Sequence, residues 1–176
     1  MDAQEFRRLL LRHKEGDERA FEKLYEYCNP KLIGTAFLYV QDKDMAISVA
    51  DDILVKLYNE PERYSEIKSP ADWLFIVAKN GSLDLLRKEQ NRRKHETKLK
   101  STVAITSISV DEKLDYYALL KQFSESEQKI IILRVDFGFP YRRIARIMDM
   151  SFNQVWWKWK KIKSHLKEIL KKEENK

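Results

Sequence analysis

The sequence contains few of the residues that interrupt or cross-link a chain. Among 176 residues there are 4 glycines, 4 prolines and a single cysteine, Cys28. One cysteine excludes an internal disulfide, and the scarcity of glycine and proline leaves little material for the tight turns of a strand-rich fold. Strand-like alternation of apolar and polar residues is also missing, whereas apolar residues recur at helical spacing. The sequence therefore predicts an all-α protein.

Long apolar runs and catalytic motifs are missing as well. No stretch of 18 apolar residues occurs, and the N-terminus has no apolar segment of the signal-peptide type. We therefore expect a cytoplasmic protein without membrane insertion. His13, His95, His165 and Cys28 do not have metal-ligand spacing, and neither a glycine-rich phosphate loop nor a nucleophile motif is present. The sequence argues against an enzyme and predicts no metal ion and no cofactor.

Charge is distributed unevenly along the chain. The formal net charge is +6, but segment 140–176 has 11 basic and 4 acidic residues, and segment 79–100 has 8 basic and 3 acidic residues. Between residues 42 and 66 the balance reverses, with 7 acidic and 3 basic residues. Two basic zones and one acidic zone suggest that the protein binds a polyanion through the former and a protein partner through the latter.

Residues 140–166 have the pattern of a helix-turn-helix. An amphipathic segment over about 141–148 predicts a short helix, and Asp149 interrupts it. Ser151 and Gln154 have the spacing of a capping box at the start of a second helix. That helix is expected to bury an apolar stripe formed by Phe152, Val155, Trp159, Ile162 and Leu166. Such a unit places its second helix in the DNA major groove; the alternative is an ordinary helical hairpin with a solvated basic face.

Amphipathic segments separated by polar breaks fill the rest of the chain. Helices are expected over about 2–14, 18–27, 32–40, 45–58 and 69–87, with a break or kink at Asn29-Pro30. Segment 89–108 has no lasting helical period, which predicts an extended, mobile linker. The predicted organisation is therefore two small helical domains, over residues 1–90 and 111–176, joined by a flexible linker over residues 91–110.

Three stretches resemble the small extracytoplasmic-function (ECF) class of bacterial sigma factors. The first is GDERAFEKLYEYCNPKL at 16–32, and the second is DILVKLY at 52–58 followed by SPADWLFIVAKNGSLDLLRK at 69–88. The third is the helix-turn-helix introduced by SESEQKIIILRVDFGFPYRRIARIM at 124–148. The resemblance implies a sigma region 2 bundle and a sigma region 4 helix-turn-helix. Their expected function is to bind core RNA polymerase and to direct promoter recognition and transcription initiation.

The same resemblance implies three sets of contact residues. The expected contacts to core RNA polymerase are Asp51, Asp52 and Lys56. The expected contacts to the minus-10 element of promoter DNA are Tyr64, Lys79, Asn80, Arg87 and Lys88. The expected contacts to the minus-35 element are Arg142, Asn153, Gln154, Trp157, Lys158, Lys160 and Lys161. Trp73 is a further aromatic residue near the minus-10 set, for which we favour packing in the core.

Two departures from the family pattern leave alternatives open. Met45, Ile47 and Ser48 stand where most relatives have acidic residues, so the polymerase-contact surface is more apolar. Trp156 and Trp157 stand where relatives have small or basic residues, and about 100° per residue turns Trp157 away from the buried stripe. Its candidate contacts are thymine methyl groups, the sugar wall of DNA and a protein partner, such as an anti-sigma factor or a DNA-targeting protein. The alternative functions are a helix-turn-helix regulator, and a sigma-like protein that a partner recruits to DNA without an ordinary minus-35 sequence.

Overall fold

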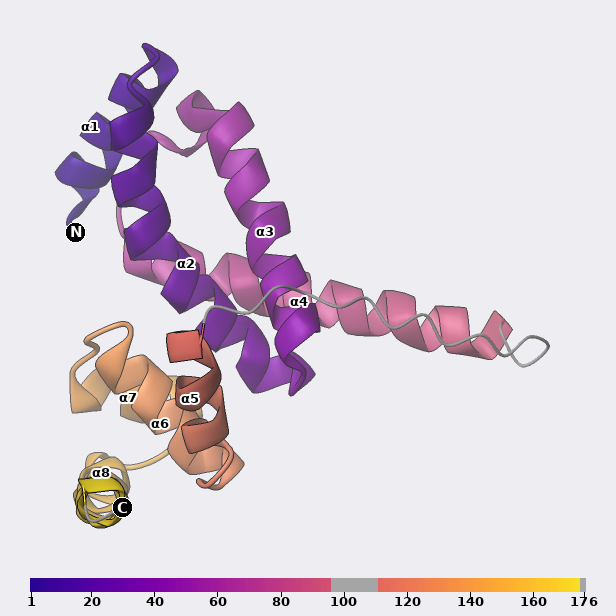
Figure 1. The fold of residues 1–176 in the computed structure, drawn as a ribbon. Helices are drawn as coiled ribbons and strands as arrows, with labels where there is room; N and C mark the ends of the chain where they lie inside the picture. Colours follow the sequence, from indigo (N-terminus) through magenta and orange to yellow (C-terminus); the bar gives the residue numbers. More distant parts are fainter. Residues whose placement is uncertain (96–110, 175–176) are drawn as a thin grey trace. The chain divides into compact units, whose positions relative to one another are not determined.

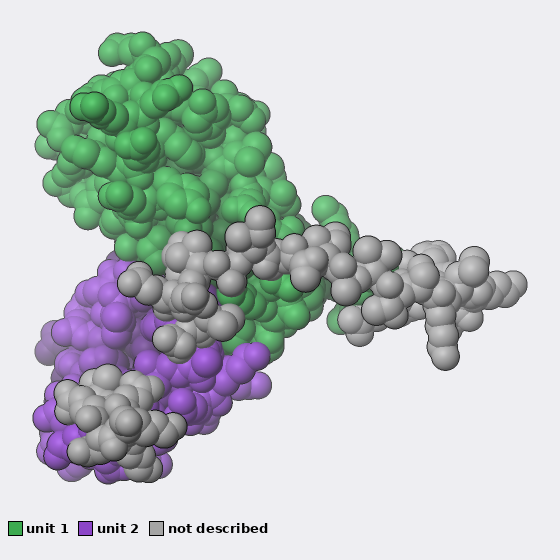
Figure 2. All heavy atoms as spheres, in the orientation of Figure 1, with its two compact units in different colours: residues 1–108 green, residues 109–176 purple. Residues whose placement is uncertain are grey.

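The computed structural model describes residues 1–95 and 111–174, and this part of the chain is helical apart from short connections (Figure 1). The prediction of an all-α protein is confirmed. The chain forms two compact units, unit 1 over residues 1–108 and unit 2 over residues 109–176 (Figure 2). Most of the predicted linker lies outside the described residues, and the assignment of roles to the two domains stays a prediction.

Unit 1 is built from four α-helices and one 3-10 helix among its described residues. They are α1 (Ala3–Lys14), α2 (Glu18–Val40), α3 (Lys43–Asn59), η1 (Pro61–Tyr64) and α4 (Pro70–His95). An aspartate side chain caps each of the first three α-helices. Asp2 accepts a hydrogen bond from the Glu5 N–H, Asp17 from the Ala20 N–H and Asp42 from the Met45 N–H.

Helix α2 passes through the predicted break at Asn29-Pro30, so the expectation of two separate helices is wrong. Pro30 lies inside the helix and is exposed, while Cys28 and Leu32 on either side of it are fully buried. Proline removes one backbone donor from the helix. The continuous apolar face, which packs mainly against α3 and α4, outweighs that local cost. Lys31 Nζ also donates to the Tyr27 carbonyl oxygen at 3.1 Å in the same turn.

Helix α4 ends at His95, beyond the end expected at about Arg87. The additional residues belong to a charged run that has no apolar stripe, which is why periodicity did not detect them. Ion pairs three residues apart stabilise this stretch, because Arg92 Nη2 lies 2.8 Å from a Glu89 oxygen and Arg87 Nη1 lies 3.0 Å from an Asp84 oxygen. The C-terminal part of α4 extends beyond the other helices of unit 1 (Figure 1).

The core of unit 1 joins all four α-helices. Its fully buried large side chains include Phe6, Leu24, Phe37, Leu57 and Leu74. In α3, Leu54 belongs to the buried face, whereas Tyr58 is 47% exposed. Trp73 is half-buried, and its ring lies 6.1 Å from that of Phe6 and 5.2 Å from that of Tyr64. Its surroundings agree with the packing role that we favoured.

Unit 2 contains four helices among its described residues. They are α5 (Asp111–Leu120), α6 (Glu125–Val135), α7 (Tyr141–Met148) and α8 (Phe152–Glu174). Its core includes Leu120, Ile130, Leu133, Ile144 and Val155, each no more than 1% exposed. The Tyr116 hydroxyl donates to an Asp136 oxygen at 3.0 Å and thereby ties α5 to the end of α6. Burial, followed by the nearby Asp136 carboxylate, raises the pKa of Tyr116 and keeps this donor protonated.

The core of unit 1 yields a prediction that compares two positions on α4. Leu74 is 0% exposed and Ile76 is 54% exposed. We expect Leu74→Ala to lower the free energy of unfolding of unit 1 by about 2–5 kcal/mol, because it removes buried apolar surface and leaves a cavity. Ile76→Ala should change it by less than about 0.5 kcal/mol. Urea denaturation followed by circular dichroism measures both; equal losses would contradict the arrangement of α4.

Candidate nucleic-acid interface

Helix α3 presents the residues predicted to bind a protein partner on its solvent side. Asp51, Asp52 and Lys56 are all exposed, opposite the buried residues that face α2. Val55, which is 57% exposed beside them, was not among the predicted contact residues. The signal was available, since Val55 follows Asp51 and Asp52 at helical spacing and lies off the buried stripe. This surface therefore combines charged side chains with an exposed apolar one, a composition suited to protein contact.

A groove of about 140 Å³ runs between α3 and α4. It is lined by Val49, Asp52, Ile53 and Lys56 from α3 and by Gly81, Asp84, Leu85 and Lys88 from α4. A Cβ atom added at Gly81 would lie 3.1 Å from Cγ1 of Val49, so glycine permits the close approach of the two helices. The groove brings Lys88, predicted to bind DNA, to the same site as Asp52 and Lys56, predicted to bind a protein.

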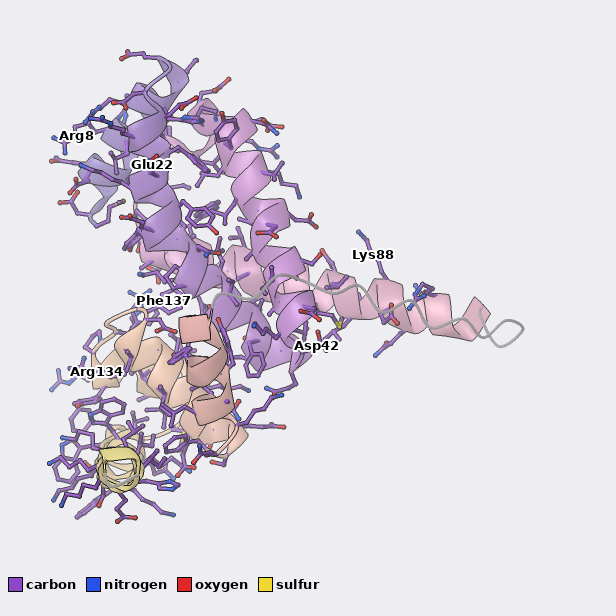
Figure 3. The ribbon with its side chains drawn as sticks, in the orientation of Figure 1. Arg8, Glu22, Asp42, Lys88, Arg134 and Phe137 are labelled. Carbon is purple, nitrogen blue, oxygen red and sulfur yellow. The ribbon has the colours of Figure 1, made fainter. Side chains whose placement is uncertain are left out.

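The remaining predicted residues of α4 share one exposed face. Lys79, Asn80 and Arg87 are exposed. Ile76 lies on the same face, three residues before Lys79 and four residues before Asn80. Ile76 was not among the predicted residues. Arg87 Nη1 is 3.0 Å from an Asp84 oxygen, so part of its charge is balanced within the helix. Figure 3 shows the side chain of Lys88 extending outward from α4. The face carries cations and an amide that can bind a phosphate backbone or bases.

Tyr64 has a packed setting rather than an open one. Its ring contacts Trp73, and the segment around η1 is linked to α1 by two ion pairs. Arg7 Nη2 lies 3.4 Å from a Glu66 oxygen, and Lys14 Nζ lies 3.9 Å from a Glu62 oxygen. Such exposed pairs each contribute little to stability. Together with the aromatic contact, they hold the segment that follows α3 against α1.

The turn of the helix-turn-helix has the predicted form. Asp149 ends α7 with a left-handed φ of 53°, and α8 begins after Ser151. The capping box is confirmed, because the Ser151 N–H donates to Gln154 Oε1 at 2.8 Å and the Gln154 N–H donates to Ser151 Oγ at 3.2 Å. The side-chain oxygen of Gln154 is therefore already engaged. At the start of α8, Phe152 is 45% exposed, so it borders the buried stripe instead of belonging to it.

Two tryptophans and a lysine form a cluster on the exposed side of α8. Trp157 is 61% exposed and Trp156 is 37% exposed, and their ring centroids are 4.9 Å apart in an edge-to-face arrangement. Lys160 Nζ lies 4.9 Å from the Trp156 ring and 5.1 Å from the Trp157 ring, within reach of a cation–π interaction with both. We call these three residues the tryptophan–lysine cluster. The outward direction predicted for Trp157 is confirmed.

Two other lysines of the predicted minus-35 set point toward α6. Lys158 Nζ donates to Ser126 Oγ at 3.1 Å. Lys161 lines a groove of about 220 Å³ together with Glu127 of α6. Hydrogen bonding from Ser124, and then the charges of Lys161 and Lys158, hold the pKa of Glu127 below its usual value. The structure therefore separates Lys158 and Lys161 from Lys160, which the sequence had grouped together.

Arginine and aromatic side chains pack together at the start of α7. Arg134 Nη1 donates to the Phe139 carbonyl oxygen at 3.0 Å, and its guanidinium lies 4.7 Å from the Tyr141 ring. The Arg143 guanidinium lies 3.8 Å from the Phe139 ring. Figure 3 marks Arg134 in this part of unit 2. Arg142, the predicted contact residue of α7, is exposed.

The described residues contain neither a metal cluster nor a helix of transmembrane type. Within residues 1–95 and 111–174, no three histidine, cysteine, aspartate or glutamate side chains lie together as a metal ion would require. In the same part of the chain, no helix combines the length and apolar character needed to cross a bilayer. Among these residues, what remains as a candidate site is the set of charged and aromatic helix surfaces described above.

Comparisons with known proteins support one family. Residues 24–92 match the family model described as sigma-70 region 2. The Bacillus subtilis (strain 168) ECF RNA polymerase sigma factor SigX is 23% identical over 152 residues, which cover 78% of this chain and 77% of that protein.

Two solved structures are also similar. The sigma factor RpoE, solved in complex with the anti-sigma factor NepR from Bartonella quintana, has 22% identity and a TM-score of 0.50, covering 86% of this chain and 96% of that one. CnrH, solved in complex with the cytosolic domain of CnrY, has 18% identity and a TM-score of 0.48, covering 95% of this chain and 97% of that one. The likeness to RpoE concerns the fold.

Glu127 closes a capping box at the start of α6, because its side chain accepts hydrogen bonds from the Ser124 N–H at 3.0 Å and from Ser124 Oγ at 2.7 Å. This interaction leads to a pH-dependent prediction. In the folded protein the pKa of Glu127 is lowered from its ordinary value of 4.5. The charged carboxylate therefore contributes its full stabilisation above pH 4.5, and this stabilisation is lost as the pH falls through the lower pKa of the folded state. We expect Glu127→Gln to lower the free energy of unfolding of unit 2 by about 0.5–1 kcal/mol at pH 7, and to have no effect near pH 2.

The matched control is Glu125→Gln, since Glu125 also lies in the first turn of α6 and is exposed. Thermal unfolding followed by circular dichroism at both pH values measures the difference. A loss of equal size at pH 7 and near pH 2 would show that the carboxylate of Glu127 does not act through its charge.

Proposed function

The chain is an ECF member of the sigma-70 family, and from this premise we propose that it binds core RNA polymerase and directs promoter recognition and transcription initiation. The observation that carries the proposal is the match of residues 24–92 to sigma-70 region 2, a segment that includes most of α2, all of α3 and most of α4. The helix-turn-helix of unit 2 supports it, because a second DNA-binding element is expected in such a protein. The function is stoichiometric binding, not catalysis.

In this proposal, α3 provides the contact to core RNA polymerase. Asp51, Asp52 and Lys56 supply charges that steer association and select the partner. Val55 supplies an apolar contact at the centre of the charged group, since it is exposed among them. The groove between α3 and α4 continues this surface to Lys88. A partner surface with complementary charges and an apolar ridge would fit it.

Helix α4 and the segment around η1 are the proposed site for the minus-10 element. Lys79, Asn80, Arg87 and Lys88 place cationic and amide groups along α4, as a single strand of DNA requires. Tyr64 is packed on Trp73, so its proposed role is to form the wall of a site rather than to move into one. The proposed minus-35 contacts are those of α7 and α8, with the tryptophan–lysine cluster on the outward side of α8.

A regulatory partner is also part of the proposal. The similar sigma factor RpoE was solved bound to the anti-sigma factor NepR. We infer that a polypeptide inhibitor of this kind could control the present chain by covering the same surfaces. The exposed aromatic rings of α8 also support a second candidate function, because exposed tryptophans are frequent interface anchors. In this second function, a protein partner binds the rings and delivers the chain to DNA without an ordinary minus-35 sequence.

The experiment that tests the proposed function is reconstitution with purified core RNA polymerase. We expect the full chain to co-elute with core enzyme in size-exclusion chromatography and to start transcription from a specific template position. Core enzyme alone is the control for non-specific initiation. The absence of a complex at low micromolar concentration, without an inhibitor present, would refute the proposal.

The acidic surface of α3 gives a prediction for assembly. We expect Asp52→Lys to weaken binding to core RNA polymerase about 10-fold or more, because it reverses a charge within the proposed interface. Glu22→Lys is the matched control, as it makes the same charge change at an exposed position on α2. Fluorescence anisotropy with labelled chain measures both affinities. Equal losses for the two variants would assign the effect to net charge and exclude a specific role for Asp52.

The lysines of α8 give a prediction for DNA affinity. We expect Lys160→Ala to weaken binding of the holoenzyme to all duplexes and to reduce the slope of log affinity against log salt by about one, as loss of a phosphate contact does. Lys161→Ala is its neighbour and should have a smaller effect, because Lys161 lies near the Glu127 carboxylate. Filter binding across a salt series measures both slopes. Identical slopes in Lys160→Ala and the unaltered protein would remove Lys160 from the interface.

A further inference from the structure

We propose that Trp157 makes α8 select thymine, through contact of its indole ring with the C5-methyl group of a thymine in the minus-35 duplex. This inference rests on the proposed function and adds the chemical group that the helix recognises. It concerns the exposed side of α8, where 61% of Trp157 and 37% of Trp156 are accessible.

The geometry of α8 fixes which side chains can reach a base. Val155 and Ile162 are buried at 0% and 1% exposure, so the opposite side of the helix is outward. At about 100° per residue, this outward side contains Asn153, Trp157 and Lys160. Each of the three is exposed. Asn153 is in the first turn, the part of a recognition helix that contacts base edges.

Polar competitors for base contact are fewer than the sequence suggests. Gln154 uses its side-chain oxygen to accept from the Ser151 N–H at 2.8 Å. Lys158 donates to Ser126, and Lys161 lines the groove beside Glu127. In the first three turns of α8 the outward side is therefore dominated by indole surface, with an amide at its start and an ammonium group over the rings.

The chemistry of the major groove assigns a partner to that surface. Base edges there present hydrogen-bond donors and acceptors, and the C5-methyl group of thymine is the apolar group among them. The apolar face of an indole ring makes no hydrogen bond to a guanine or cytosine edge, whereas it can cover a methyl group and remove it from water. Lys160 lies 4.9 Å and 5.1 Å from the two rings, which keeps a positive charge next to the apolar contact and near the phosphates.

The test uses the holoenzyme and a randomised duplex library with fixed flanks. Selection with the unaltered protein identifies the preferred duplex; its thymines are then replaced one at a time by deoxyuridine, which removes only the methyl group. We expect one or two such replacements to weaken binding about three- to five-fold each, the effect of one buried methyl-sized group. The same replacements should have no effect on Trp157→Ala, whereas Trp157→Phe should retain part of the preference.

The outcomes separate this inference from the proposed function. If the holoenzyme assembles and selects a duplex but deoxyuridine binds as well as thymine at every position, the thymine contact is refuted and the proposed function stands. If holoenzyme forms but no duplex is enriched, the thymine contact is refuted together with the proposed minus-35 recognition by α8, whereas binding to core RNA polymerase stands. If no holoenzyme forms, the proposed function is refuted, and the thymine contact that rests on it is refuted as well. Lys160→Ala is the control variant, because it should lower affinity while keeping the difference between thymine and deoxyuridine.

Discussion

Burial of Val155 and Ile162 is the constraint on which the recognition surface of unit 2 depends. These two residues lie two turns apart on α8 and are almost fully covered, so they fix the rotation of the helix about its axis. A helix held in this way has one side that faces solvent. The position of each polar or aromatic residue in α8 then determines whether its side chain points to solvent or to the core. The capping box at Ser151 and Gln154 fixes where the helix begins. Rotation and start together determine that Trp157 faces solvent.

Unit 1 uses the same principle with a longer helix at its centre. Helix α2 buries residues on both sides of Pro30 against α3 and α4, and this leaves the opposite sides of α3 and α4 available for binding. The acidic surface of α3 and the basic face of α4 border one groove, to which Asp52 and Lys88 both contribute. A partner bound to α3 would therefore lie beside DNA bound to α4. The close approach of the two helices at Gly81 is what brings the surfaces together.

Periodicity and capping signals predicted most of this architecture, and the failures have physical causes. The all-helical fold and the capping box of α8 depend on local chemistry that the sequence displays directly. Pro30 was expected to interrupt α2, but tertiary burial outweighs a single lost hydrogen bond. The end of α4 was missed because a charged helix has no apolar period. Lys158 and Lys161 look equivalent to Lys160 in the sequence. Only the contacts of Lys158 and Lys161 with α6 distinguish these two residues from Lys160.

The exposure of Trp157 is informative because the fold does not require it. The stability of α8 comes from its buried stripe and its capping box, and neither involves the outward tryptophan. A polar side chain at that position would avoid exposing a large apolar ring to water. We infer that the ring acts on something outside unit 2, and the positive charge of Lys160 near it favours an anionic ligand that carries apolar groups. Duplex DNA with thymine methyl groups in its major groove has both properties.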